Sequence, residues 1–396
     1  MMEIEIPAQG TLHGIRQWLL LSAGLIVGLG LAHMGTSTMP FQIGALVDGF
    51  GISNDESGLF GFVEVGSISL ALILVSPWVS RYPPFLIAMS GCLITALGGA
   101  GLFIVPAFAL QLAFGACVGA GFGLVFAATI SSAAASPQAD RLYAIGNGGG
   151  LFIILAAMAS VPAVAGHLGK TGIFATLAVL ALIAIPFFAG MRRGGEIEKI
   201  KLSAVLVPGA PGLLFGWSCF SLGAGGLYVF TERIAQSIHL ADTEIAGVLS
   251  SGTLVGFLGT TVTAAIGNRI NRRLALTGGM IGTALSCLLI GQAWDLISYA
   301  AGIYLYWLCY MFLYCYLLGT AAVLDKSGRL GTLGSGLERM GYAVGAGLGG
   351  ILSQHFSFST TGTMGFTACL LGLMVGFPGV FRVLKARRDA GVRNSG

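Results

Sequence analysis

The stretch TGIFATLAVLALIAIPFFAGM at residues 171–191, followed directly by RRGGEIEKIK at residues 192–201, decides the class of fold. The first segment contains no charged side chain, and its 21 residues rise about 30 Å as an α-helix, the thickness of a membrane's hydrocarbon core. The second segment is the longest charged stretch of the chain and falls at its midpoint. An apolar run of this length that ends in charged residues predicts a transmembrane helix emerging into water.

The whole chain shares the character of that first segment. Hydrophobic residues make up 55% of its 396 residues and charged residues only 9%, against about 25% charged residues in a soluble domain. Backbone polar groups in hydrocarbon must be satisfied within a helix or a closed barrel. Because the apolar runs are about 20 residues long rather than alternating strands of about ten, helices are favoured. The composition therefore predicts an all-α polytopic membrane protein, and the 63 glycines indicate closely packed helices.

Twelve apolar spans are predicted, and only Pro106 separates the third span from the fourth. The spans of the first half are Trp18–Val47, Asp55–Ser80, Phe85–Val105, Phe108–Ala135, Leu142–Gly166 and Thr171–Met191. The spans of the second half are Gly209–Gln236, Thr243–Gly267, Leu274–Gln292, Leu296–Leu324, Thr332–Gln354 and Thr361–Leu384.

The charged midpoint divides the chain into two six-helix bundles. We expect an N-terminal tail at residues 1–17, a first bundle at 18–191, a linker at 192–208, a second bundle at 209–384 and a tail at 385–396. The halves echo each other at an offset of 188 or 189 residues, since Arg141-Leu142 recurs as Arg329-Leu330 and Phe41 recurs as Phe230. Parallel repeats of this kind are typical of transporters whose site lies at the repeat interface.

The basic residues predict the orientation, because cytoplasmic loops carry an excess of Lys and Arg. With a cytoplasmic N-terminus, every Lys and Arg except Lys170, Arg233 and Arg339 falls in a cytoplasmic loop or tail or at a cytoplasmic helix end. We therefore expect both termini and the linker in the cytoplasm, Lys170 outside, and a location in a cell membrane, with a bacterial inner membrane favoured. The N-terminus shows no clear cleavage site, so we expect no cleaved signal peptide.

Twelve spans in two halves around a charged linker resemble the major facilitator superfamily. That family carries a basic turn between its second and third helices and again between its eighth and ninth. The second copy here is Gly267-Asn268-Arg269-Ile270-Asn271-Arg272-Arg273, with Asn268 where Asp is usual, and the first, Val79-Ser80-Arg81-Tyr82-Pro83-Pro84, keeps only the Arg. The resemblance implies a twelve-helix fold, transport by alternating access, and gating roles at the inner face for Arg81, Arg269 and Arg273. Without the Asp, that inner contact should be weaker or differently arranged.

Ionisable side chains at membrane depth are candidates for function, because each costs about 2.5–3.5 kcal/mol to insert. His33 lies in the first span and Glu64 in the second, and we predict that they form a proton-coupling pair. Two structural alternatives remain open. Glu64 can bond a helix hydroxyl such as that of Ser67, and His33 can bridge Thr36 and its neighbours.

Two further charged pairs lie in the second half. Arg339 lies about 10 Å into the eleventh span, where it can bind a substrate carboxylate through its planar guanidinium. Glu338, next to it, is a further substrate-binding candidate. The alternative is that Arg339 pairs with Glu338 or clamps an inner gate. Glu232 and Arg233 lie near the outer end of the seventh span, where we expect an outer gate or a local ion pair.

Aromatic residues gather in the tenth span. Tyr306 and Tyr310 lie near its middle on one helical face, which predicts an aromatic wall that contacts substrate; core packing with bonded hydroxyls is the alternative. Asn147, within the glycine run at residues 146–150 of the fifth span, is a further substrate-binding candidate.

The sequence thus favours a secondary transporter of a small organic solute, coupled to protons, with a slight preference for symport of an organic anion that is possibly aromatic. The alternative is proton-coupled efflux of lipophilic compounds; a membrane-embedded enzyme or a non-transporting scaffold is less favoured. GxxxxGK[ST], HExxH and GxSxG motifs are missing, so we expect no enzyme, cofactor or metal. The seven cysteines lie in apolar runs and predict no disulfide, and a net charge of +4 does not indicate nucleic acid. The expected partners are the solute, protons and the lipid bilayer, and the protein is expected to be a monomer.

Overall fold

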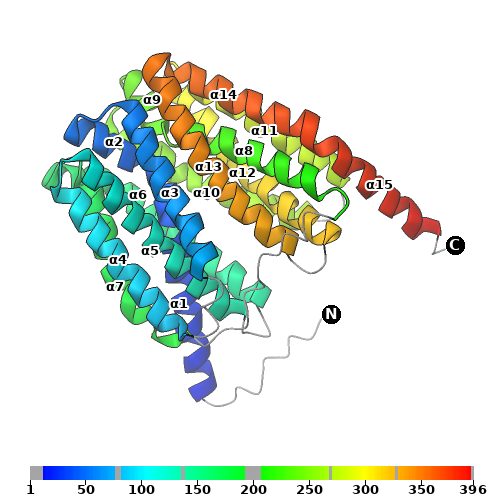
Figure 1. Cartoon of the computed structure of the whole chain (residues 1–396), viewed down its shortest axis with the longest axis horizontal. Coiled ribbons are helices and arrows are strands. Elements are labelled where there is room, and N and C mark those ends of the chain that lie inside the picture. Colours follow the sequence, from blue (N-terminus) through cyan, green and yellow to red (C-terminus); the bar gives the residue numbers. More distant parts are fainter. Residues whose placement is uncertain are drawn as a thin grey trace.

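The computed structural model describes residues 12–75, 82–134, 139–191, 207–266, 270–325 and 329–393. In these residues the chain is almost entirely helical and contains no β-strand. Figure 1 shows two groups of helices that come together at the end where α2 and α9 lie, while α1 begins and α15 ends at the opposite side. We call these the α2/α9 end and the terminal end.

The first bundle contains the helices up to residue 190, which pack mainly against one another. They are α1 (Leu12–Ser37), α2 (Met39–Phe50), α3 (Asn54–Val75), α4 (Pro84–Ile104), α5 (Phe108–Ala134), α6 (Ala139–Leu168), α7 (Gly172–Ala184) and the 3-10 turn η1 (Ile185–Gly190).

The second bundle repeats this order from residue 210. Its helices are α8 (Ala210–Tyr228), α9 (Thr231–Ser237), α10 (Asp242–Ile266), α11 (Arg272–Gly291), α12 (Leu296–Leu324), α13 (Arg329–His355), α14 (Phe358–Leu371), the π-helical turn η4 (Gly372–Gly376) and α15 (Phe377–Arg393). The charged linker at 192–201 lies outside the described residues.

The predicted architecture of twelve spans in two bundles is confirmed. Ten helices in the described part of the chain are long and apolar enough to cross a membrane, and α8 with α9, bent by 42°, makes an eleventh. The twelfth is α13, which has 27 residues but is less apolar, because it carries Glu338, Arg339 and several small polar residues. The chain is therefore a multi-pass membrane protein.

The first and seventh spans are each broken near the α2/α9 end, although the sequence predicts each as one continuous span. In the first span α1 ends at Ser37, and Pro40 enters the first turn of α2. Proline lacks the N–H that would bond the carbonyl of residue 36, so it favours a break there. The seventh span breaks at the corresponding place, between Tyr228 and Thr231. Each half thus contains a short helix that is turned away from its span, α2 in the first half and α9 in the second.

In the described part of the chain the main contacts between the bundles are made by α3 with α13, α6 with α10, and α2 with α9. Two backbones come close at Gly58, near the start of α3, and Gly350, near the end of α13, where a Cβ added to Gly58 would lie 2.7 Å from the Cα of Gly350. Small residues permit this contact between helices without a side chain intervening. Both positions lie toward the α2/α9 end, so the bundles are pressed together there.

Candidate functional site

A cluster centred on Arg339 joins the bundles at mid-depth. Arg339 lies ten residues into α13, about 15 Å along the helix from its start, and its side chain is only 7% exposed. One terminal nitrogen of Arg339 is 3.0 Å from Nδ1 of His33, and the other is 3.5 Å from the hydroxyl of Thr36. The guanidinium also stacks over the ring of Phe126, 5.3 Å from its centroid. We call His33, Thr36, Phe126 and Arg339 the central cluster.

The contact with Arg339 fixes the protonation of His33. A guanidinium can only donate hydrogen bonds, so Nδ1 of His33 must accept, and the ring proton must sit on Nε2. An imidazole that accepts at one nitrogen is neutral. His33 also forms a side-chain hydrogen bond with Asn147 of α6. The fold therefore brings together three residues that the sequence singles out in three different spans.

Glu64 is fully buried on α3, and its neighbour is Gln42 rather than His33. The amide nitrogen Nε2 of Gln42 donates to Oε1 of Glu64 over 3.2 Å, while Oε2 of Glu64 has no hydrogen-bond partner among the described residues. A Cβ added to Gly35 would lie 3.0 Å from Oε1 of Glu64 and 2.9 Å from the ring of Phe122, so α1 comes close to the carboxyl group at a glycine. No direct contact between Glu64 and His33 is found among the described residues, so the predicted pair is not formed here. The sequence analysis missed Gln42, which the break after Ser37 places beside Glu64.

Glu338 and Arg339 are adjacent in sequence but engage different neighbours. The carboxylate of Glu338 accepts a hydrogen bond of 2.7 Å from the hydroxyl of Tyr310, and its backbone carbonyl accepts one from Ser221. Arg339 turns instead to the first bundle. In the described part of the chain the two side chains form no ion pair with each other.

The tyrosines form an aromatic stack within the second bundle. Tyr306 stacks between Tyr228 and Tyr310, with ring centroids 5.4 Å apart on each side. Phe220 follows, 4.6 Å from Tyr310. The hydroxyl of Tyr306 bonds the carbonyl of Ala224 in α8, as the packing alternative expects. Contact of these residues with a substrate therefore stays a prediction.

Two tyrosines that the sequence analysis did not select hold the break of the first span. Tyr228 donates to the carbonyl of Ser37 over 3.0 Å, and Tyr342 donates to that of Thr36 over 3.2 Å. Both come from the second bundle, and both carbonyls lie where α1 loses its helical hydrogen bonds. Pro40 was the available signal, since a proline within an apolar span predicts unpaired carbonyls.

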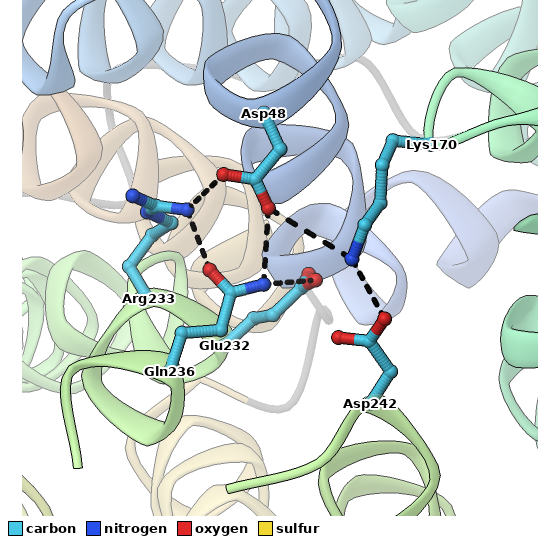
Figure 2. A network of polar contacts seen from close by, with 6 residues as sticks. All are labelled: Asp48, Lys170, Glu232, Arg233, Gln236 and Asp242. Carbon is cyan, nitrogen blue, oxygen red and sulfur yellow. Dashed lines mark hydrogen bonds and ion pairs between the residues drawn. The ribbon is translucent and has the colours of Figure 1, made fainter. Parts of the chain in front are cut away.

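A second set of contacts joins the bundles at the α2/α9 end, and Figure 2 shows it from close by. Arg233 of α9 forms an ion pair with Asp48 of α2, and Lys170 lies 2.7 Å from Asp242 and 4.0 Å from Asp48. Burial lowers the pKa of Lys170, but its hydrogen bond to Asp242 and the nearby acidic groups outweigh this and raise the pKa overall. We call the six residues the outer network: Asp48, Lys170, Glu232, Arg233, Gln236 and Asp242.

The helices α2 and α9 face each other with equivalent residues in contact. Gln236 donates to Asp48 over 3.1 Å, and Glu232 lies against Gly44, where an added Cβ would be 2.5 Å from the carboxyl group. Both pairs are 188 residues apart, the offset of the internal repeat. The pair Glu232 and Arg233 thus makes contacts across the halves, and Arg233 also has a local bond to Gln236.

The residues predicted to gate the inner face are only partly described. Arg81 and Arg269 lie outside the described residues. Arg273 is the second residue of α11, and its backbone N–H donates to the side chain of Asn271, which caps the helix. The guanidinium of Arg273 stacks over Phe381 at 5.3 Å from the ring centroid. Both groups belong to the second bundle, so a gating role for Arg273 stays a prediction.

No family model matches the chain, and no curated protein matches its sequence. Solved structures do match. A D-xylose-proton symporter is 14% identical, with a TM-score of 0.70 over 92% of this chain and 98% of the other. A bacterial homologue of the human lysosomal transporter Spinster, in an inward-facing and unoccupied conformation, is 14% identical, with a TM-score of 0.63 over 92% of this chain and 95% of the other. The chain therefore shares the fold of these two solved structures over most of its length, as the resemblance to the major facilitator superfamily predicts.

Proposed function

We propose that the protein is a secondary transporter that moves a small organic solute by alternating access. The observation that carries this is the central cluster: buried ionisable groups from both bundles meet at mid-depth, while the outer network joins the bundles at one end. Charged groups at membrane depth are costly, and they most often mark a transport path. The two solved structures described above, named as a symporter and a transporter homologue, support the same class.

The α2/α9 end faces the outside in this proposal, because the basic residues gather toward the other end. The structure then represents a state closed to the outside, in which solute exchanges with the cytoplasm. The outer network and the contact of Gly58 with Gly350 support this assignment.

Glu64 carries the coupled proton in this mechanism. It is a fully buried carboxyl group whose only hydrogen-bond partner in the described residues is the neutral amide of Gln42. An ion pair would hold a carboxyl group in its ionised form, whereas a neutral partner such as an amide leaves it able to bind a proton. His33 of the central cluster is a second group that can take up a proton, and protonation of its Nδ1 would end its contact with Arg339.

Arg339 binds the solute, and the favoured solute is an organic anion. The hydrogen-bond partners of its guanidinium in this state are the neutral imidazole of His33 and the hydroxyl of Thr36. A carboxylate would replace both with a two-point, charge-assisted contact. The aromatic stack of Tyr228, Tyr306 and Tyr310 supports a second candidate, proton-coupled efflux of lipophilic compounds.

Uptake into proteoliposomes, with and without an imposed pH gradient, tests the proposal. The panel contains aromatic and aliphatic carboxylates, their neutral amides, and lipophilic cations. We expect a carboxylate to accumulate only with the gradient, and its amide to be transported poorly. Transport of lipophilic cations alone would move efflux to first place, and no gradient-driven movement of any solute would refute proton coupling.

A further inference from the structure

Glu64 and Gln42 each leave one oxygen atom without a partner, and the two groups are already in contact. Both side chains are fully buried. Gln42 Nε2 shares its two hydrogens among Oε1 of Glu64, the carbonyl of Gly35 at 3.1 Å and the hydroxyl of Thr38 at 3.2 Å. Oε2 of Glu64 and Oε1 of Gln42 remain, and neither forms a hydrogen bond within the part of the chain that the structure describes. If Glu64 is ionised, both atoms are acceptors, and two buried acceptors stay unsatisfied.

One proton would satisfy both atoms. A protonated carboxylic acid donates through one oxygen and accepts through the other, and a primary amide does the same through its nitrogen and oxygen. The bond from Gln42 Nε2 to Glu64 Oε1 is one half of such a pair, and a proton on Oε2 of Glu64 would form the other half with Oε1 of Gln42. We propose that Glu64 is protonated in this closed state, and that Gln42 senses this proton and links it to closure of the α2/α9 end.

The position of Gln42 explains how the proton on Glu64 can affect the α2/α9 end. Gln42 lies in the first turn of α2, and its amide also bonds the carbonyl of Gly35, near the end of α1, and the hydroxyl of Thr38, within the break. Six residues further along the same helix, Asp48 joins the outer network. When Glu64 loses its proton, a carboxylate oxygen faces the amide oxygen of Gln42, and the two repel each other. Gln42 must then turn away, α2 loses an anchor, and its contact with α9 is weakened.

Of the groups around Glu64, Gln42 is the one expected to respond when Glu64 gains or loses its proton, because the others are uncharged or bond other partners. Gly35 of α1 and, beyond it, Phe122 of α5 lie on one side of the carboxyl group, and neither carries a charge. Tyr342 of α13 is close enough to interact with it electrostatically, but the hydroxyl of Tyr342 donates to Thr36. His33 of α1 and Arg339 of α13 bond each other, and Glu338 bonds Tyr310.

Four variants distinguish a sensor role of Gln42 from a purely structural role of its amide. Glu64→Gln replaces the acid with an amide that can form the same two-bond pair at any pH. Gln42→Leu removes the two bonds of the proposed pair with Glu64 and replaces the amide with an apolar side chain of similar size. The double variant Glu64→Gln with Gln42→Glu exchanges the acid and the amide between the helices. Gln111→Leu is the matched control, because Gln111 is equally buried in the first bundle but bonds Val105 instead.

The readout is the distance across the α2/α9 end, which does not depend on transport. Spin labels at His167→Cys and Thr243→Cys, in a background without other cysteines, place one exposed reporter on each bundle. We expect the parent protein to show short distances at acidic pH, with the ratio of separated to closed molecules rising about tenfold at alkaline pH, equivalent to about 1.4 kcal/mol. Glu64→Gln should keep, at every pH, the ratio of separated to closed molecules that the parent shows at acidic pH, and Gln42→Leu should lose the pH response. The exchanged pair should regain it, and Gln111→Leu should behave as the parent.

The inference is overturned if the parent distances do not change with pH, if Gln42→Leu keeps the parent response, or if the exchanged pair fails to respond. The inference rests on the proton role proposed for Glu64, but the two fail separately. If gradient-driven accumulation depends on Glu64 but the pH response of the distances is unchanged in Gln42→Leu, the transport proposal stands and the sensor role of Gln42 is refuted. A protein that responds through Gln42 but accumulates no solute would refute only the transport proposal.

Discussion

Two polar regions join the bundles, and they are built differently. The outer network consists of charged pairs in which the side chains of Lys170, Asp48 and Asp242 are 38%, 26% and 49% exposed. In the buried central region, Arg339 meets a neutral imidazole and Glu64 meets a neutral amide. Exposed ion pairs contribute little individually and are screened by salt. Buried groups that lack a countercharge respond strongly to a single proton or a single anion. The comparison indicates that the outer network holds one state together while the central region decides when it changes.

The largest effect should come from removing the proton site of the central region. Glu64→Gln should abolish pH-driven accumulation of the solute while counterflow exchange continues, because an amide cannot release a proton. The measurement is uptake into proteoliposomes with an imposed gradient, beside exchange at equal pH. His33→Gln should reduce accumulation more mildly. Unchanged pH dependence in Glu64→Gln would mean that this carboxyl group has only a structural role.

Arg339→Lys tests the anion site and should have the next largest effect. Lysine cannot reproduce the planar contact of a guanidinium, and a charge-assisted hydrogen bond contributes about 1.5–3 kcal/mol. We expect apparent solute affinity to fall about ten- to a hundredfold, with thermal stability close to that of the parent. Arg382→Lys at an exposed position of α15 is the control. If removing Glu338 as well restores a destabilised Arg339→Ala variant with transport intact, the pair is structural, and the anion argument ends.

A smaller effect should follow from breaking the outer network. Asp48→Asn removes the ion pair with Arg233 but keeps a side chain that can still bond Gln236. Because the pair is partly exposed, we expect the population open at the α2/α9 end to rise by up to about fivefold. Labelling of a single cysteine at position 243 with an impermeant thiol reagent measures this. Exchange of the charges, Asp48→Arg with Arg233→Asp, should return the labelling toward the parent level; a further increase would contradict a role for this pair.

The smallest effect concerns the pH dependence of Lys170. Its pKa is raised in the folded protein, so its contribution to stability is fully present below the ordinary lysine pKa and is lost only as pH rises through the raised value. Lys170→Met should therefore lower the thermal stability by a small, constant amount across neutral pH, and the difference from the parent should vanish only in strongly alkaline solution. A difference that changes between mildly acidic and neutral pH would show that Lys170 does not set the charge balance of the outer network.

The second bundle carries most of the features that the sequence could locate. Arg339, Tyr306 and Tyr310 stand out because a cation or a row of tyrosines is unusual at membrane depth, and all three lie buried in the interior. Their neighbours did not stand out in the same way. Gln42, Tyr228 and Tyr342 are uncharged residues in apolar surroundings, and a glutamine or a lone tyrosine in a span has no periodic pattern that marks it. They gain importance only through the carbonyls and the carboxyl group placed beside them.

The sequence by itself determined the class of protein, the twelve spans and the division into halves, because partition into hydrocarbon is decided within each stretch of about 20 residues. It also contained Pro40, the cause of the break in the first span, but it did not show that the break places Gln42 beside Glu64. Only the tertiary structure decided that His33 meets Arg339, 306 residues away, and that Glu64 meets Gln42 instead of His33. Such contacts depend on how each helix is rotated about its axis and how closely its neighbour approaches, as at Gly58 and Gly350. The hydrophobicity of a span depends on that segment alone, whereas the partner of a buried polar group depends on how all the helices pack together.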